Sequence, residues 1–154
     1  MTLPVHCPVK GRAIPMRSVP DPVFAESMVG PGIAIDPDRA EGADTDAVAP
    51  VDGTVVTLHP HAFVVLTPSG RAVLVHLGID TVKLKGEGFT LHAVKGETVR
   101  AGQRMITWNP AEVERHGYSP VCPVVAVEAK PEQLAELRES DEVEHGDQIF
   151  IWSA

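Results

Sequence analysis

Glycine and proline divide this chain into short pieces, and that division constrains the fold more than any other feature of the sequence. The 154 residues include 13 glycines and 14 prolines, which follow no fixed period. Both residue types mark turns, so a chain interrupted this often favours short strands over long helices or a collagen-like repeat. Apolar runs separated by turn residues at intervals of about eight to twelve positions predict an all-β fold, a compact antiparallel β-sandwich with two or three short helices.

The strongest strand signals lie in the middle of the chain. Residues 62–68 and 71–79 flank Ser69-Gly70, a pattern that predicts a β-hairpin. Asp52-Gly53 lies within another β-rich run, residues 48–58, and predicts a second hairpin. Residues 5–16 are interrupted by prolines and predict only short edge pieces. Further strands are expected at residues 32–36, 88–94, 97–103, 104–108, 123–128 and 147–152.

Three segments have helical patterns. Residues 20–29 predict one short helix that ends before Gly30-Pro31-Gly32. Residues 110–116 predict a second, with Asn109 as N-cap and Gly117 as the stop. Residues 131–138 predict a third, with Leu134 and Leu137 facing inward. We find no linker, so residues 1–154 are expected to form a single domain.

Charge and composition exclude several classes of protein. The formal net charge of −8 disfavours nucleic acid and anionic membrane surfaces as partners and favours a partner with a basic face. Two cysteines, Cys7 and Cys122, are too few for a disulfide framework and are expected to be reduced thiols. No apolar run has the length of a membrane span, and the N-terminus lacks a signal-peptide pattern, so we expect a cytoplasmic protein without membrane insertion.

Two of the seven histidines are expected to lie side by side. In the hairpin across Ser69-Gly70, position 62 or 63 lies opposite 76 or 77, which brings His61 next to His76 at one end of the sheet. His6, His92, His116 and His145 stand apart from other polar groups and are interpreted as surface or satisfied core residues.

Adjacent imidazoles at the end of a sheet admit three interpretations. The rings can form a structural pair. The HxH pattern at residues 59–61 and the HxxxD pattern at residues 76–80 can bind zinc. Alternatively, a neutral imidazole can attack phosphorus while its neighbour steadies the transferring group. Spacing alone leaves the last two open.

Longer segments carry a resemblance to a known family. VPDPVFAESMVGPGIAI (19–35), VAPVDGTV (48–55), HAF (61–63), VHLGIDTVKLKGEGF (75–89), VKGETVRAGQ (94–103) and GDQIFI (146–151) closely resemble the glucose-type enzyme IIA family of the bacterial phosphoenolpyruvate:sugar phosphotransferase system. The resemblance implies an antiparallel β-sandwich that acts as a phosphocarrier. Such a protein takes a phosphoryl group from phosphohistidine on the protein HPr and passes it to a cysteine of the IIB domain of a sugar permease, with no cofactor.

The resemblance also assigns roles to individual residues. The histidine of the HLGIDTV block, His76, is the implied phosphoryl acceptor, and His61 matches the second histidine, which supports transfer. Asp21 and Asp80 match aspartates that face HPr. The expected apolar ring around the site comprises Phe24, Met28, Val29, Leu74 and Val82.

One position departs from the family. His59 stands where a threonine is usual, and it can replace that hydroxyl as a donor, point to solvent or add a metal ligand. The expected chemistry needs a neutral His76 whose tautomer is fixed by a hydrogen bond to a backbone carbonyl near Gly78. His61 is expected to donate an N–H to a phosphoryl oxygen.

Two alternatives come from other classes of protein. A zinc-dependent, lysostaphin-like peptidase would use the HxH and HxxxD ligands, although their order along this chain is reversed. A binding module related to biotinyl or lipoyl domains lacks its attachment lysine here. No IIB cysteine signature occurs, so the IIB and IIC parts are expected on separate proteins, and regulatory partners remain compatible with the phosphocarrier.

Overall fold

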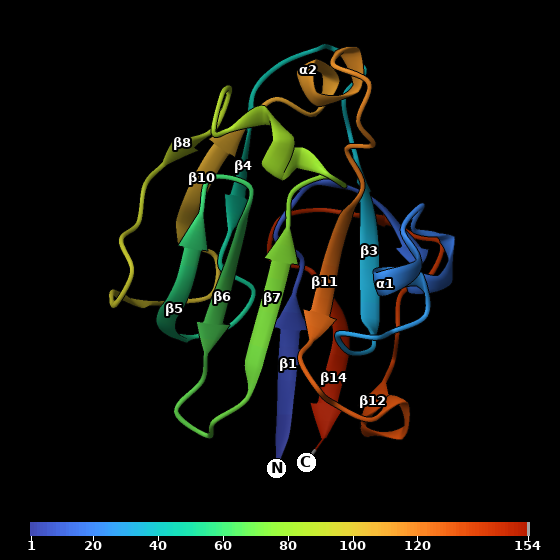
Figure 1. Cartoon of the computed structure of the whole chain (residues 1–154). Coiled ribbons are helices and arrows are strands. Elements are labelled where there is room, and N and C mark those ends of the chain that lie inside the picture. Colours follow the sequence, from blue (N-terminus) through green and yellow to red (C-terminus); the bar gives the residue numbers. More distant parts are fainter. Residues whose placement is uncertain (154) are drawn as a thin grey trace.

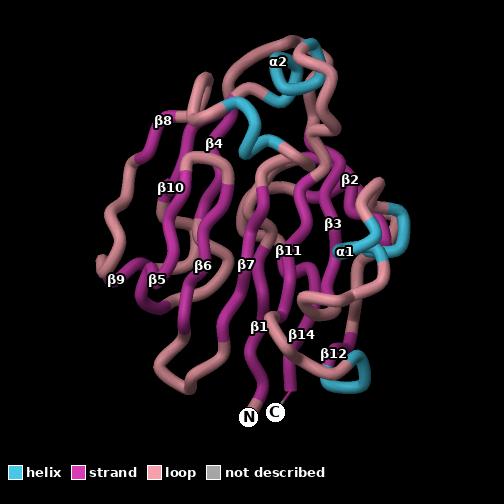
Figure 2. The backbone as a smooth tube through the Cα atoms, in the orientation of Figure 1, coloured by secondary structure: helices cyan, strands magenta, loops and turns pink. Residues whose placement is uncertain are grey.

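The computed structural model describes residues 1–153, in which antiparallel strands form one large sheet and two small ones (Figures 1 and 2). In spatial order, the eight-stranded sheet contains β13 (Glu142–Val143), β2 (Gly11–Pro15), β3 (Gly32–Pro37), β11 (Cys122–Ala126), β7 (Ala72–His76), β6 (Ala62–Leu66), β5 (Gly53–His59) and β9 (Thr98–Val99). The small sheets run β1 (Thr2–His6), β14 (Gln148–Ser153), β12 (Leu134–Ala135) and β4 (Thr45–Val48), β10 (Arg104–Trp108), β8 (Thr90–Leu91). The predicted antiparallel β-sandwich is confirmed.

The helices of the described residues are short. Two are α-helices, α1 (Pro22–Ala25) and α2 (Pro110–Arg115), and three are 3-10 turns, η1 (Met16–Ser18), η2 (Thr81–Leu84) and η3 (Pro131–Gln133). None of the helices in residues 1–153 is long and apolar enough to span a membrane. In Figure 1, α1 lies in front of β3, and α2 lies at the end of the molecule opposite the two termini.

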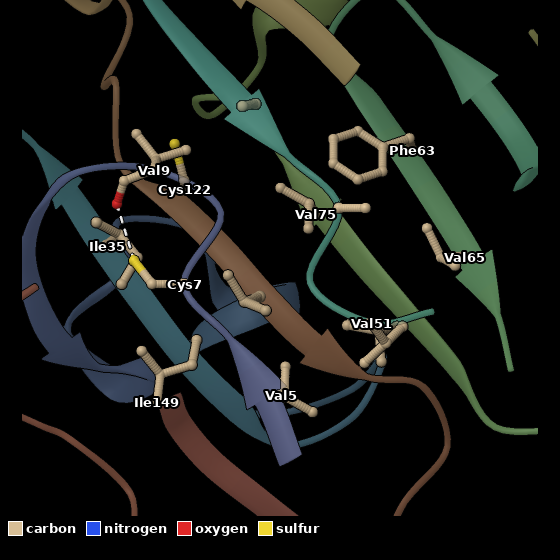
Figure 3. Close-up of a cluster of buried hydrophobic side chains, with 14 of the residues drawn as sticks. Val5, Cys7, Val9, Ile35, Val51, Phe63, Val65, Val75, Cys122 and Ile149 are labelled. Carbon is tan, nitrogen blue, oxygen red and sulfur yellow. Dashed lines mark hydrogen bonds between the residues drawn. The ribbon is translucent and has the colours of Figure 1, made fainter. Parts of the chain in front are cut away.

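The core is built mainly from aliphatic side chains that the sheets enclose. Figure 3 shows Val5 of β1, Ile35 of β3, Phe63 of β6 and Val75 of β7 packed together with both cysteines. Cys7 and Cys122 are free thiols with no solvent exposure, as expected. Burial raises the pKa of both thiols, that of Cys7 to about 12, so neither is a thiolate at neutral pH.

Two strand predictions were wrong. Asp52-Gly53 does not close a hairpin, because β4 pairs with β10 whereas β5 pairs with β6 and β9. The turn instead receives a hydrogen bond from the backbone N–H of Ala101 to Oδ1 of Asp52, at 2.7 Å. The N-terminal segment was expected to supply edge pieces only, yet β2 lies inside the large sheet between β13 and β3.

Two helix predictions also need correction, whereas α2 forms as predicted with its Asn109 cap. The helix predicted over residues 20–29 is confined to Pro22–Ala25, and Ser27 just beyond it has a φ of 56°. Residues 131–138 form one 3-10 turn and then β12, in which Leu134 pairs with Trp152. Leu134 is buried as expected, but Leu137 is 38% exposed.

Candidate functional site

The β6–β7 hairpin forms as predicted and positions the central histidine. Ala62 pairs with His76, and the backbone N–H of Leu77 donates to the carbonyl of His61 at 2.7 Å. Val73 and Val75 point into the core with no exposure, whereas Leu74 and His76 are partly exposed on the opposite face. The alternation along β7 therefore carries His76 to the outer face of the large sheet.

Aromatic rings surround His76 on two sides. The centroids of the His61 and His76 rings are 5.1 Å apart in an edge-to-face arrangement, which confirms the predicted proximity. Phe24 of α1 lies on another side, with its ring centroid 5.3 Å from that of His76. His59 stacks on the far side of His61, with a centroid distance of 5.7 Å and an interplanar angle of 16°.

The tautomer of His76 is fixed by the loop that follows β7. Nδ1 of His76 lies 2.5 Å from the carbonyl oxygen of Gly78, which can only accept, so Nδ1 donates and Nε2 keeps a free lone pair. The loop is anchored because the Thr81 hydroxyl donates to the Leu77 carbonyl and the Ile79 N–H donates to the Ser119 carbonyl. This confirms the expected backbone carbonyl near Gly78.

Both central imidazoles are neutral at neutral pH. Burial lowers the pKa of His76, and the contact with Gly78 and the charges of Asp21 and Asp80 oppose that change. Burial, together with the neighbouring His76 and His59 rings, lowers the pKa of His61 to about 4. A neutral ring with one nitrogen donating to a carbonyl can act as a nucleophile through the other nitrogen.

The residues expected to form an apolar ring around the site differ in burial. Phe24 is buried against His76, and Leu74 and Val29 are partly buried beside it. Met28 and Val82 are 72% and 60% exposed, so they are available to a partner. Val23 of α1, next to Phe24 in the same apolar run, is 44% exposed.

The two predicted aspartates differ in structure. Asp21 is the N-cap of α1, and its Oδ1 accepts a hydrogen bond from the N–H of Val23 at 2.9 Å. Asp80 is exposed, has a φ of 61° and immediately precedes η2. Both influence the pKa of His76, so both lie close enough to add negative potential at the site.

The remaining histidines lie outside the cluster. His92, His116 and His145 are exposed and His6 is partly so, and each has a hydrogen-bond partner, as expected. Within residues 1–153, no three side chains of His, Cys, Asp or Glu are grouped in a way that could hold a metal ion.

A β-sandwich that presents a neutral, tautomer-fixed histidine on the outer face of its large sheet, with Phe24 packed beside it, has the build of a carrier that holds a group on imidazole. The family model described as phosphoenolpyruvate-dependent sugar phosphotransferase system, EIIA 1, matches residues 3–131. A solved structure, glucose permease IIA from Mycoplasma capricolum, is 35% identical, with a TM-score of 0.87 over 98% of this chain and 96% of that chain. The chain belongs to the EIIA 1 family.

Membership defines the activity. The protein is a phosphocarrier of the sugar phosphotransferase system, and it transfers a phosphoryl group through histidine from HPr to a IIB domain. The zinc-peptidase and binding-module alternatives have no support in these matches. The family was therefore identified correctly from the sequence motifs.

Proposed function

We propose that Nε2 of His76 is the atom that takes the phosphoryl group from phospho-HPr. The observation that carries this assignment is the hydrogen bond from Nδ1 to the Gly78 carbonyl, which leaves the Nε2 lone pair as the nucleophile. In the transfer, the N–P bond of the donor histidine breaks and a new N–P bond forms at Nε2, while the donor nitrogen recovers its lone pair. No proton has to leave His76, because its neutral ring already carries the proton on Nδ1.

His61 has a supporting role in this proposal. Its ring lies edge-to-face with that of His76 and is neutral, so it can donate one N–H to a phosphoryl oxygen without attacking phosphorus itself. A donor placed where charge develops stabilises the transferring group. Since the ring neither moves nor titrates to do so, the donor is preorganised.

The rim around the histidines is the proposed docking surface for HPr and IIB. Apolar contact would come from two exposed residues, Met28 and Val82, and two partly exposed ones, Val29 and Leu74. The buried Phe24 packs in one cluster with Val29 and Leu74. Asp21 and Asp80 add negative charge that suits a basic partner face. The same rim would serve both partners in turn, because each must reach Nε2 of His76.

The proposal also covers the domain organisation, the cellular location and the regulatory partners of the protein. Residues 1–154 form one EIIA domain in our proposal, supported by the 98% coverage in the structural match. The protein acts in the cytoplasm, where a net charge of −8 keeps it away from anionic surfaces. Regulatory proteins that read its phosphorylation state would meet the same rim, where phosphorylation of His76 adds a negatively charged phosphoryl group.

Phosphorylation assays on variants test the assignment. With phosphoenolpyruvate, enzyme I and HPr, native protein should acquire one acid-labile, base-stable phosphate, and His76→Ala should acquire none. His61→Gln should still be labelled by HPr, but its delivery to a IIB domain should slow by about 10- to 100-fold because a donor to the phosphoryl group is lost. His116→Ala is the matched control, since His116 is exposed at the C-cap of α2, and this variant should behave as native. Labelling of His76→Ala would disprove the assignment.

A further inference from the structure

A third imidazole continues the row formed by His76 and His61. His59 ends β5 and pairs with Ala62, which pairs in turn with His76 on the next strand. The His59 ring is stacked on His61 with an interplanar angle of 16°, and His61 meets His76 edge-on. His61 thus lies between two rings, one toward the acceptor and one toward solvent.

The backbone keeps His59 in this position. The ladder partner Ala62 fixes its Cα, and Pro60 restricts the chain that joins it to His61. Pro60 is itself close to the loop after η2, where a Cβ at Gly86 would lie 3.3 Å from Cγ of Pro60. The stack is therefore supported on both sides of the β5–β6 turn.

The described neighbours of the His59 ring are known on two sides. The His61 ring is stacked on it, and its ladder partner on β6 is the uncharged Ala62. Lys85 and Glu87 flank Gly86 in the loop that packs on Pro60, so their charges oppose each other. Asp21 and Asp80 act on His76, beyond His61.

Phosphorylation changes the electrostatics of this row. The phosphoryl group places negatively charged oxygens beside His61, which favours binding of a proton nearby. Burial and the flanking rings lower the pKa of His61 to about 4, so that ring resists protonation. His59 is exposed, so water reaches its ring directly, whereas His61 is partly buried between two rings. Of the two stacked rings, the outer one is therefore the one that can exchange a proton with solvent most readily.

We propose that His59 is a positioning residue for phosphoryl transfer: it takes a proton from solvent when His76 is phosphorylated and, through the stack, holds neutral His61 with an N–H toward the phosphoryl oxygens. The inference rests on the proposed function of His76. It assigns a role to the position at which this chain departs from the usual threonine. The positive charge on His59 also offsets part of the phosphoryl charge, so the phosphorylated form is favoured as the pH falls.

The test compares the phosphoryl equilibrium with HPr for native protein and three variants at about pH 6 and about pH 8.5, on either side of the imidazole range. At the lower pH, His59→Gln should have an equilibrium constant for phosphoryl transfer from HPr that is roughly threefold below that of native protein, as expected for one partly screened charge. At the higher pH, the two equilibrium constants should be equal. His59→Lys should equal native at the lower pH and exceed it at the higher pH. His92→Gln, which alters another exposed histidine, should equal native at both.

A second measurement follows the proton directly. The ring NMR signals of His59 should titrate at higher pH in phosphorylated protein than in free protein, and the midpoint should not move in His76→Ala treated with the same donors. A purely structural role for His59 would make His59→Gln differ from native equally at both pH values, and that result would overturn the proposal.

Locating the phosphate separates the two proposals. Mass spectrometry that places it on His76 while native and His59→Gln protein agree at both pH values would refute the role of His59 alone. A phosphate on any other residue would refute the His76 assignment and the role of His59 together. A pH-dependent difference with the phosphate on His76 supports both.

Discussion

Gly78 has two roles beside His76. Its carbonyl receives the Nδ1 proton of His76, and its φ of 82° is a conformation that side-chain-bearing residues rarely adopt. A Cβ at this position would lie 2.6 Å from Cγ2 of Thr81 and 3.0 Å from the carbonyl oxygen of Ser119. Both the strain and the crowding would move the carbonyl that fixes the tautomer of His76.

We expect Gly78→Ala to lower the free energy of unfolding by about 3 kcal/mol, the sum of a left-handed conformation and local overpacking, and to slow phosphoryl uptake from HPr. Urea denaturation and rapid-quench labelling measure the two effects. Gly70→Ala is the control, because its φ is 88° but a Cβ there meets nothing within 4 Å. It should cost only about 1 kcal/mol and leave uptake unchanged. Equal uptake by Gly78→Ala and native protein would contradict the role of the carbonyl.

The sequence predicted the proximity of His61 and His76 better than the interactions around them. Hairpin register alone placed His61 beside His76, because a Ser-Gly turn and strict alternation define opposite positions. The stack of His59 on His61 was not predicted, since ring orientation depends on side-chain packing that no sequence pattern encodes. The capping role of Asp21 was also missed, although Asp-Pro before an apolar run is a recognisable N-cap signal.

At the level of elements, Asp21 has two roles at the start of α1: it caps the helix, and it places a negative charge near His76. The helix has four residues, Pro22–Ala25, and brings Phe24 against His76. Such a short helix has little stability of its own, so the hydrogen bond from Val23 N–H to Oδ1 of Asp21 matters. The same carboxylate lies close enough to influence His76.

Two substitutions at Asp21 separate the cap from the charge. Asp21→Asn keeps an acceptor oxygen and should leave the free energy of unfolding almost unchanged, whereas Asp21→Ala should lower it by about 1 kcal/mol. Both remove the charge and should weaken HPr binding by a similar factor of about two to five. Thermal or urea unfolding and titration calorimetry with HPr check this. If the two variants are equally unstable, the cap contributes nothing.

Prediction of elements succeeded where local and long-range signals agree. The β6–β7 hairpin and the capped helix α2 have turn or cap residues that match their tertiary contacts. The expected helix over residues 131–138 failed because Leu134 pairs with Trp152, a contact 18 positions away that helix propensity ignores. The expected hairpin at Asp52-Gly53 failed because a turn signal does not say which strands will pair.

The whole molecule carries a net charge of −8, and the proposed docking rim includes Asp21 and Asp80, whose charges act on His76. Long-range attraction to a basic partner raises the association rate and is screened by salt. The overall sandwich was predictable from turn spacing and the family motifs. Its division into three sheets was not predictable, because two-residue strands such as β8 and β12 leave little pattern in a sequence.

We expect the association rate constant with HPr to fall by roughly tenfold when ionic strength rises from about 0.05 to 0.5 M, since the Debye length then shortens severalfold. Asp80→Asn should reduce both the rate and its salt dependence, and asparagine tolerates the positive φ of this position. Stopped-flow measurements give these rates. Glu132→Gln removes the same charge from exposed η3 and should change the slope much less. Identical slopes for the two variants would argue against Asp80 as a rim contact.

The sealed thiols of the core have a practical consequence for studying this molecule. Cys7 and Cys122 have no accessible surface, and Sγ of Cys7 donates to the carbonyl of Val9 (Figure 3). An alkylating reagent can therefore reach sulfur only in molecules whose sandwich has opened. The rate of maleimide incorporation, followed as an increase in the mass of the protein, therefore reports how often the sandwich opens, and no introduced label is needed.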